Sequence, residues 1–368
     1  MWDTNMETNE KKAEMSYFEL LKANRQLASE RIRKAMLDEA GTRVLKGSHL
    51  NKRIEAALAG TSDGIRMAAC LEKTGSQCGS VWCARCRDQK QKWLVRTFGE
   101  RISDQGMTEQ QARERFRLIT VLHEVVSIDQ EIDDDGNETG SYMLEMALNS
   151  ICQASADMKL SIKNLKRNIE RAGYQIWMRG GTHLELVNTD LLLFQEVGNR
   201  KAKVLCDWID TKLNKGKYYD KRASRAIVVH FHALVDLNGM DDGRLKKLLK
   251  EKWNDTEHQV HMQRTWTKIK FRHGEKEQSL DDALTGIGRY CFNGSNHDLR
   301  FQEFWGTGKL IFEQDIETDE NGNVVTFAKE VAARASGEML NTNDIKLLIL
   351  AHNAVAGTSN RGLTVGIY

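Results

Sequence analysis

The spacing of apolar and polar residues predicts which parts of the chain are helices and which are strands. Apolar residues recur at every third or fourth position in residues 9–60, which predicts helices, and "SHLNKRIEAALAG" ends in a glycine that suits a helix C-cap. The same spacing predicts further helices in residues 87–102, 142–172, 240–253 and 279–293. Apolar runs predict strands in residues 115–126, 225–237 and 260–273, and a strand pair or one bent strand in residues 174–188.

The order of these segments indicates an α+β fold. Strands and helices alternate irregularly, which favours a central, mainly antiparallel sheet flanked by helices. Asn321 and Gly322 predict a hairpin turn within residues 309–330, and helical segments follow it. The acidic loop of residues 127–141 nearly matches a calcium loop, but Tyr142 replaces the required glutamate, so a solvated loop is expected.

The pattern divides the chain into four regions. They are a helical N-terminal region (1–64), a cysteine-bearing element with a basic helix (65–110), a core domain (111–305) with an insertion at about 190–224, and a hairpin with a helical C-terminal region (306–368).

Composition is that of a soluble protein. The chain has 368 residues, 40% of them hydrophobic and 29% charged. No apolar run reaches the roughly 18 to 20 residues of a membrane span. The N-terminus has no apolar signal-peptide core, so a cytoplasmic protein is expected. The chain has no proline, where ordinary usage predicts roughly 18.

The net charge of +2 says little about partners, but one segment is strongly basic. Six basic residues and one acid lie between positions 212 and 225; the bases are Lys212, Lys215, Lys217, Lys221, Arg222 and Arg225. Such a cluster can bind phosphate groups, and it can equally be a solvated loop.

Four cysteines form the pattern C-x7-C-x4-C-x2-C, which comprises Cys70, Cys78, Cys83 and Cys86. Four thiolates satisfy tetrahedral zinc, and this clustering favours a structural metal site over disulfides. A redox pair at Cys83 and Cys86, or four unbound thiols, are the alternatives. A zinc site would fix the following helix, whose Arg87, Lys90 and Lys92 could then contact DNA.

The segment "IVVHFHALVD" carries two histidines with one hydrophobic residue between them. On a strand, His230 and His232 share one face and Phe231 occupies the other. A catalytic divalent ion needs about three protein ligands. The strand "THLELVN" offers His183 and Glu185, and we expect Glu185 to be the third ligand. Such a mixed site accepts Mg²⁺ or Mn²⁺. Ordinary buried strand histidines are the alternative.

The His-hydrophobe-His run resembles the signature of the HUH endonuclease superfamily. The chain is also similar to the rolling-circle replication initiators of small bacterial plasmids in the order of five features. These are the cysteine segment, the apolar "FRLITVLHE" with Thr120, the strand with Glu185, the strand with His230 and His232, and a helix with Tyr290 in "GIGRYCFNG". The resemblance covers roughly residues 65–305.

This resemblance implies a fold, a reaction and partners. It implies an HUH core and a metal-dependent, site-specific DNA endonuclease and strand transferase. Tyr290 would attack a phosphodiester of single-stranded origin DNA, giving a 5′-phosphotyrosyl bond and a 3′-OH primer. The partners would be double-stranded origin DNA, the single-stranded nick site, and a host helicase and polymerase. The family's lysine three residues after the tyrosine is replaced by Asn293, so Arg289 or Arg300 would have to supply that cation.

Other interpretations remain open. An HUH transposase or a relaxase would share this chemistry, and Tyr218 lies before the histidine strand, as the relaxase order requires. A zinc-bearing DNA-binding protein without catalytic activity, or a zinc-dependent hydrolase, would need no tyrosine nucleophile. His123 and Glu124 would line the site near Thr120.

Overall fold

The computed structural model has an α+β architecture built on a five-stranded antiparallel sheet. It describes residues 52–71, 77–132, 138–189, 200–214, 225–265, 268–271, 274–292, 296, 299–301, 311–318, 324–331, 339–357 and 364–367. The expected helices before residue 52 and the basic residues 215–224 lie outside these ranges. Among the helices of the described part, none is long and apolar enough to cross a membrane.

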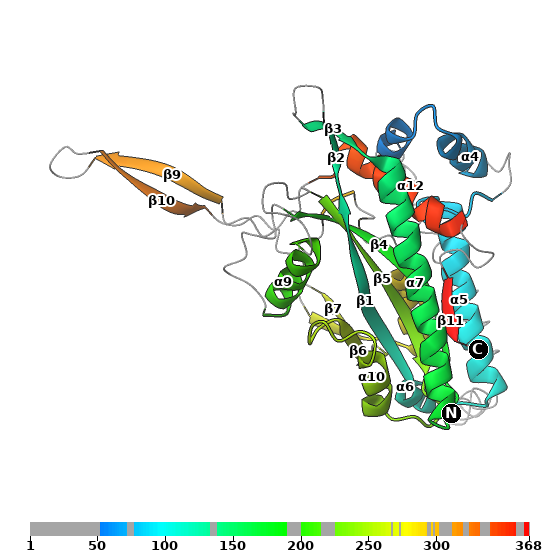
Figure 1. Ribbon diagram of the computed structural model, residues 1–368. Coiled ribbons are helices and arrows are strands. Elements are labelled where there is room, and N and C mark those ends of the chain that lie inside the picture. The colour runs from blue at the N-terminus through cyan, green and yellow to red at the C-terminus, as the bar shows by residue number, and fades with distance from the viewer. Residues whose placement is uncertain are drawn as a thin grey trace, which may run out of the picture.

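The described helices and strands follow one another as shown in Figure 1. The helices are α4 (Ser62–Leu71), α5 (Ala84–Asp104), α6 (Glu109–Arg115), α7 (Leu144–Arg171), α9 (Arg200–Asn214), α10 (Asp242–Lys250), α11 (Leu280–Phe292) and α12 (Thr342–Gly357). The strands are β1 (Phe116–Ile128), β2 (Gln130–Ile132), β3 (Glu138–Tyr142), β4 (Trp177–Asn188), β5 (Arg225–Asp236), β6 (Val260–Arg264), β7 (Lys268–Phe271), β8 (Gly274–Glu277), β9 (Ile311–Thr318), β10 (Val324–Val331) and β11 (Thr364–Ile367).

The main sheet has the strand order β11-β4-β5-β1-β6, with β5 at its centre. All its neighbouring pairs are antiparallel, as the sequence predicted. Helices cover both faces, which explains why β5 is apolar almost throughout and buried from Ala226 to Asp236. The hairpin predicted in residues 309–330 is present as β9 and β10.

Side chains of β5 alternate between two cores. Val229, Phe231 and Val235 point to one face, where they join the apolar stripe of α7 and the buried residues of α12. Leu234 points to the other face, toward α5 and α11, and Val228 on that same face packs against α9. Between these last two clusters, the same face carries the two histidines of β5.

Three predicted elements differ from the structure. Within residues 174–188, Trp177–Asn188 form one continuous strand, and its two glycines allow close approach: a Cβ on Gly180 would lie 1.9 Å from the carbonyl oxygen of His232, and one on Gly181 would lie 2.2 Å from that of Cys291. The strand expected in residues 260–273 is divided between β6 and the β7–β8 hairpin. The loop expected in residues 127–141 contains the β2–β3 pair.

Candidate active site

Three histidines meet on the face of the sheet that α5 and α11 cover. The antiparallel register places His183 of β4 directly opposite His230 of β5, and Gly181 opposite His232. The ring centroids are 5.3 Å apart for His183 and His230, 4.4 Å for His183 and His232, and 4.8 Å for His230 and His232. One ligand nitrogen of each ring lies within 4.8 Å of the other two, so the group can hold a metal ion.

One nitrogen of each ring is engaged by the protein. Nε2 of His183 donates a hydrogen bond to the carbonyl oxygen of Cys291 (2.8 Å), and Nδ1 of His230 donates one to that of Val228 (3.3 Å). Nδ1 of His232 lies 2.7 Å from the hydroxyl oxygen of Thr120. Hydrogen bonds of this kind orient the imidazole ligands of metal sites and fix the nitrogen that faces the ion.

The three rings are buried, and this sets their charge. Burial lowers the pKa of His230 to about 4 and lowers the pKa of His183 and His232 well below the usual value. The neighbouring imidazoles lower the pKa of His183 and His232 further. All three rings are therefore neutral at pH 7, which is the form that binds a metal ion.

Glu185, the expected third ligand, is not a member of this group. It lies opposite Val228, two residues further along β4 than His183, so the register brings His183 to the pair instead. Glu185 is buried, and it lies near enough to Tyr290 for its charge to raise the pKa of that phenol. The group therefore offers three imidazoles in place of two imidazoles and a carboxylate.

Tyr290 lies beside the three histidines. It is in the last turns of α11, and its ring centroid is 4.2 Å from that of His232 at an interplanar angle of 51°. The side chain is 43% exposed, so a large substrate can reach it. Burial of the hydroxyl raises the pKa of Tyr290, a hydrogen bond with Thr120 lowers it, and Glu185 raises it; the net shift is upward. The phenol therefore needs activation to act as a nucleophile.

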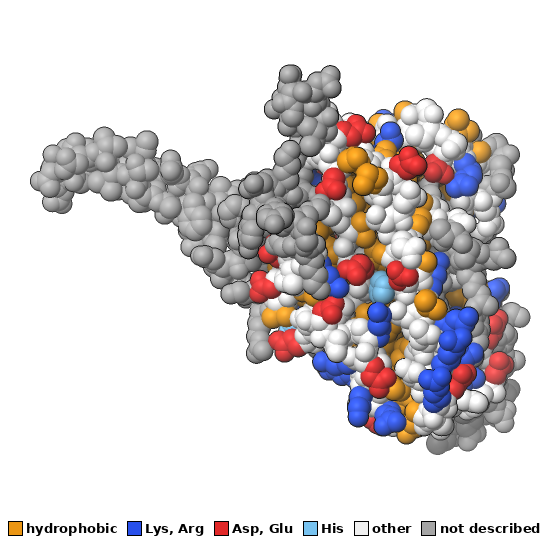
Figure 2. Space-filling model, viewed as in Figure 1, with side chains coloured by type: hydrophobic (Ala, Val, Ile, Leu, Met, Phe, Trp, Pro, Cys, Tyr) orange, Lys and Arg blue, Asp and Glu red, His pale blue; other side chains and the backbone are white. Residues whose placement is uncertain are grey.

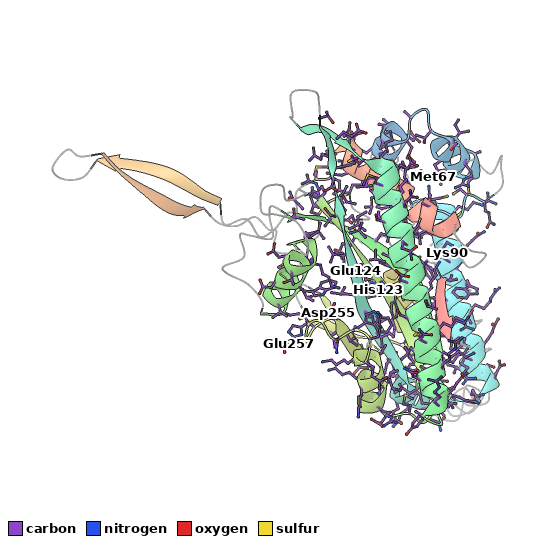
Figure 3. The ribbon with its side chains drawn as sticks, in the orientation of Figure 1. Met67, Lys90, His123, Glu124, Asp255 and Glu257 are labelled. Atoms are coloured by element: carbon purple, nitrogen blue, oxygen red, sulfur yellow. The ribbon has the colours of Figure 1, made fainter. Side chains whose placement is uncertain are left out.

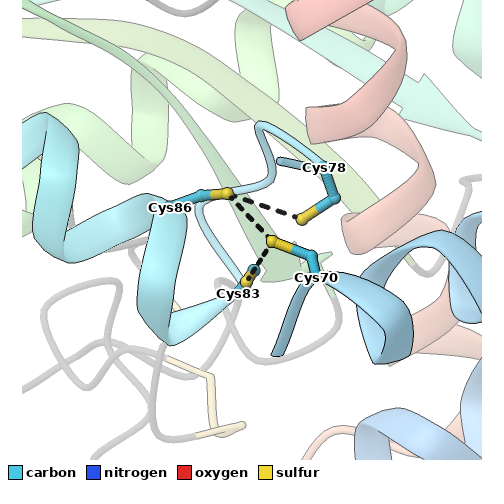
Figure 4. Close-up of side chains that lie close together, drawn as sticks. All are labelled: Cys70, Cys78, Cys83 and Cys86. Atoms are coloured by element: carbon cyan, nitrogen blue, oxygen red, sulfur yellow. Dashed lines mark hydrogen bonds between the residues drawn. The ribbon is translucent and has the colours of Figure 1, made fainter. Parts of the chain in front are cut away.

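The four cysteines meet in a second group (Figure 4). Sγ of Cys86 lies 3.6 Å from that of Cys70 and 3.7 Å from that of Cys78, and the sulfurs of Cys83 and Cys70 are 3.7 Å apart. Four sulfurs around zinc at about 2.3 Å would be about 3.8 Å apart, so these distances fit the edges of a tetrahedral site. The backbone N–H of Gly79 donates to Sγ of Cys86 (3.3 Å), as a thiolate ligand would require.

The residues expected to contact DNA fall into three groups. Lys92 and Arg289 are exposed, and Arg87 and Lys90 are half-buried on the first turns of α5. Lys217, Lys221 and Arg222 lie outside the described residues. Arg225 differs from expectation: its guanidinium forms an ion pair with the buried Asp344 of α12 (3.2 Å) and lies over Phe301, so it acts inside the protein.

His123 and Glu124 also differ from expectation. His123 lies three residues after Thr120, so alternation along β1 already places it on the face opposite the three histidines, where it packs against Trp253. The β-bulge between Leu122 and Glu124 shifts the register of β1, so Glu124 no longer shares a face with Thr120. There both residues line a pocket of about 530 Å³. Figure 3 labels them together with Asp255, and Figure 2 shows acidic side chains gathered near the middle of this face of the molecule.

Two contributors to the site were not predicted. The sequence offers His183 beside Glu185, and only the strand register distinguishes the two as ligands. Gly181 contributes by its missing side chain, which lets the last turn of α11 approach β4.

Comparisons with known proteins leave the family open. No protein-family model matches the chain, and no curated protein or solved structure does so either.

Proposed function

We propose that this protein is a metal-dependent DNA nickase of the HUH type that initiates rolling-circle replication of a plasmid. The observation that carries the proposal is the position of Tyr290, whose ring packs on His232 at the edge of a three-histidine group. A tyrosine beside a metal site, partly exposed, is the arrangement that phosphodiester transesterification needs.

The chain's own residues would carry the covalent step. Oη of Tyr290 attacks the phosphorus of one phosphodiester in single-stranded DNA and loses its proton to solvent. The bond between phosphorus and the 3′ oxygen breaks, and that oxygen takes up a proton and leaves as a 3′-OH. The DNA downstream of the nick stays joined to Tyr290 through its 5′ phosphate, and attack by a 3′-OH on that phosphorus reverses the step without ATP.

The donor set favours a transition-metal ion. His183, His230 and His232 would hold a divalent ion that polarises a phosphate oxygen and offsets the charge that develops there. Three imidazoles suit Mn²⁺, Zn²⁺ or Co²⁺ better than Mg²⁺, which prefers oxygen ligands. Cys70, Cys78, Cys83 and Cys86 would hold a structural Zn²⁺.

A replication initiator is favoured over the other HUH proteins by the single tyrosine on α11. Within the described residues, Tyr290 is the tyrosine that contacts a ring of the three-histidine group. Exposed Lys92 and Arg289 would hold the DNA backbone, and the 3′-OH product would be extended by a host polymerase behind a helicase. All of these act in the cytoplasm of the host.

A covalent-adduct assay tests the proposal. The protein is incubated with Mn²⁺ and circular single-stranded plasmid DNA, and denaturing gels then detect DNA-linked protein. Wild type should form an adduct, Tyr290→Phe should form none, and Tyr174→Phe, which alters a half-buried tyrosine before β4, should behave as wild type.

Each alternative result would overturn part of the proposal. An adduct with Tyr290→Phe would overturn the role of Tyr290. Metal-dependent cleavage without an adduct would indicate a hydrolase. Binding without cleavage on any single strand would indicate a DNA-binding protein without catalytic activity.

A further inference from the structure

Helices α5 and α11 pack closely at Gly288, two residues before Tyr290. A Cβ at this position would lie 3.2 Å from the carbonyl oxygen of Gln91 and 3.2 Å from Cγ2 of Val95, both on α5. Further along the same contact, Trp93 of α5 packs edge-on against Phe292 of α11. A side chain at position 288 would therefore push the two helices apart.

Helix α5 is fixed at both of its ends. At its start, Cys83 is the N-cap residue and Cys86 lies in the first turn, so two of the four clustered thiols belong to this helix. At its end, Arg101 forms an ion pair with the fully buried Asp236 of β5 (3.0 Å). Loss of the cysteine cluster would release the start of α5, whereas Leu94, Phe98 and Ile102 still hold its C-terminal half in the core.

Helix α11 is held on the other side of Tyr290 by the sheet. The carbonyl of Cys291, which follows Tyr290 directly, accepts the hydrogen bond of His183 (2.8 Å), and its oxygen lies 2.2 Å from where a Cβ of Gly181 would be. Tyr290 is thus placed by two contacts, one to α5 through Gly288 and one to β4 through Cys291.

We propose that Gly288 and the cysteine-anchored α5 together position Tyr290, so that release of metal from the four cysteines displaces the tyrosine from the three histidines. The two groups share no residue, and the contact between α5 and α11 connects them. The catalytic consequence rests on the function proposed above, whereas the structural coupling does not. Gly288 is a positioning residue, since it touches neither substrate nor metal.

Hydrogen exchange tests the coupling without any DNA. The experiment uses the variant His230→Ala, in which the three-histidine group lacks one ligand and the cysteines remain intact. The variant is first loaded with zinc, and the zinc is then removed with a chelator. A colour reagent for zinc confirms the release. Amide exchange should increase about 10-fold or more across residues 280–292 and remain unchanged in α9, which covers the same face of the sheet but packs in a separate apolar cluster from that of α5 and α11. Unchanged exchange in α11 after confirmed zinc release would overturn the proposal.

A pair of glycine variants tests the positioning role. Gly288→Ala should keep its zinc and its cooperative unfolding but slow adduct formation about 10- to 100-fold at saturating DNA, because small misplacements of a reacting group are costly. The KM for DNA should stay the same. The control is Gly357→Ala at the end of α12, where a Cβ would meet nothing within 4 Å.

The outcomes separate the two proposals. Wild-type rates in Gly288→Ala would overturn the positioning role. If wild type itself forms no adduct, the proposed function fails, and the exchange experiment still decides whether the cysteine cluster controls α11.

Discussion

The hydroxyl oxygen of Thr120 lies 2.7 Å from Nδ1 of His232, and the same hydroxyl hydrogen-bonds with Tyr290. Thr120 therefore joins a candidate metal ligand to the candidate nucleophile. With a metal ion on Nε2 of His232, Nδ1–H would donate to the Thr120 oxygen, and the Thr120 proton would then point toward the tyrosine oxygen. Such an arrangement orients the ring and favours the phenolate.

Thr120→Val tests this relationship. The change keeps the shape of the side chain and removes the hydroxyl, so we expect adduct formation to fall about 10- to 100-fold, the usual cost of losing a partner of a metal ligand. Rates of adduct formation on single-stranded DNA measure the effect. The control is Thr182→Val on the opposite face of β4, where the buried hydroxyl has no hydrogen-bond partner and its loss should change neither rate nor folding.

The identity of the third ligand is decided by comparing His183→Ala with Glu185→Gln. Loss of a direct ligand should cost more than the about 10- to 100-fold that outer partners cost, so His183→Ala should bind Co²⁺ at least 100-fold more weakly. Glu185→Gln should keep the metal. Absorption spectra of bound Co²⁺ distinguish nitrogen from sulfur ligands and so report on each site separately. Retention of the imidazole-bound ion in His183→Ala would return the role to Glu185.

Much of the fold was predictable because it depends on local periodicity. The helix expected over residues 142–172 is α7, whose apolar stripe includes Ile151, Met158 and Ile162. The strand order was not predictable, because β1 and β5 pair with each other although residues 129–224 lie between them in the sequence. Glycines in a strand pattern predict a bend and a close approach equally well, and the structure shows the latter.

The site was predictable where a single strand determines it. His230 and His232 share a face, and Phe231 is fully buried in the core on the other side, as period-two alternation requires. The third ligand depends on the register between two strands, which local sequence does not encode. The bulge that turns Glu124 away from the face of Thr120 is likewise a property of the pairing between β1 and β5.

Removing one cysteine should remove the structural metal. Burial raises the pKa of Cys78 and Cys83, so these thiols release protons only when a cation is bound. Cys86→Ser should lose its zinc in elemental analysis, and with it about 4 kcal/mol of unfolding free energy when zinc is present at about 1,000 times its Kd. Cys152→Ser, a half-buried cysteine of α7 outside the group, should retain the zinc. A Cys86→Ser protein with full zinc content would contradict a four-cysteine site.

The stability of the protein should fall as the pH drops below 6.5, in part through His123. Burial lowers the pKa of His123 to about 4, with smaller effects from the surrounding charges, and Nε1–H of Trp253 donates to its Nδ1 (3.0 Å). The unfolded chain binds a proton at about pH 6.5 and the folded one near pH 4, so stability is lost as pH falls through this interval, by at most about 3 kcal/mol. Urea unfolding at a series of pH values gives the unfolding free energy of wild type and His123→Gln. Plotted against pH, the two free energies should have different slopes between pH 6.5 and 4 and equal slopes at pH 7 to 8.

Mutation of Arg225 should lower the stability of the protein and mutation of Lys92 should not, although both residues were expected to bind DNA. The guanidinium of Arg225 compensates Asp344, which is 1% exposed and also accepts a hydrogen bond from the hydroxyl of Tyr142. Arg225→Ala leaves that charge buried and should lower the unfolding free energy by about 3–5 kcal/mol in urea. Lys92→Ala should leave stability unchanged within about 0.5 kcal/mol, because its ion pair with Asp88 is exposed.

The same two variants differ in their effect on DNA affinity. A lysine that contacts a phosphate adds about 0.9 to the slope of log affinity against log salt on duplex DNA, so Lys92→Ala should reduce that slope by about 1. Arg225→Ala is measured without urea, at a temperature where the variant stays folded. It should leave the salt slope unchanged, because the Arg225 guanidinium points into the protein. A reduced slope in Arg225→Ala would show that the residue leaves Asp344 to reach DNA. An unchanged slope in Lys92→Ala would place the DNA path away from the start of α5.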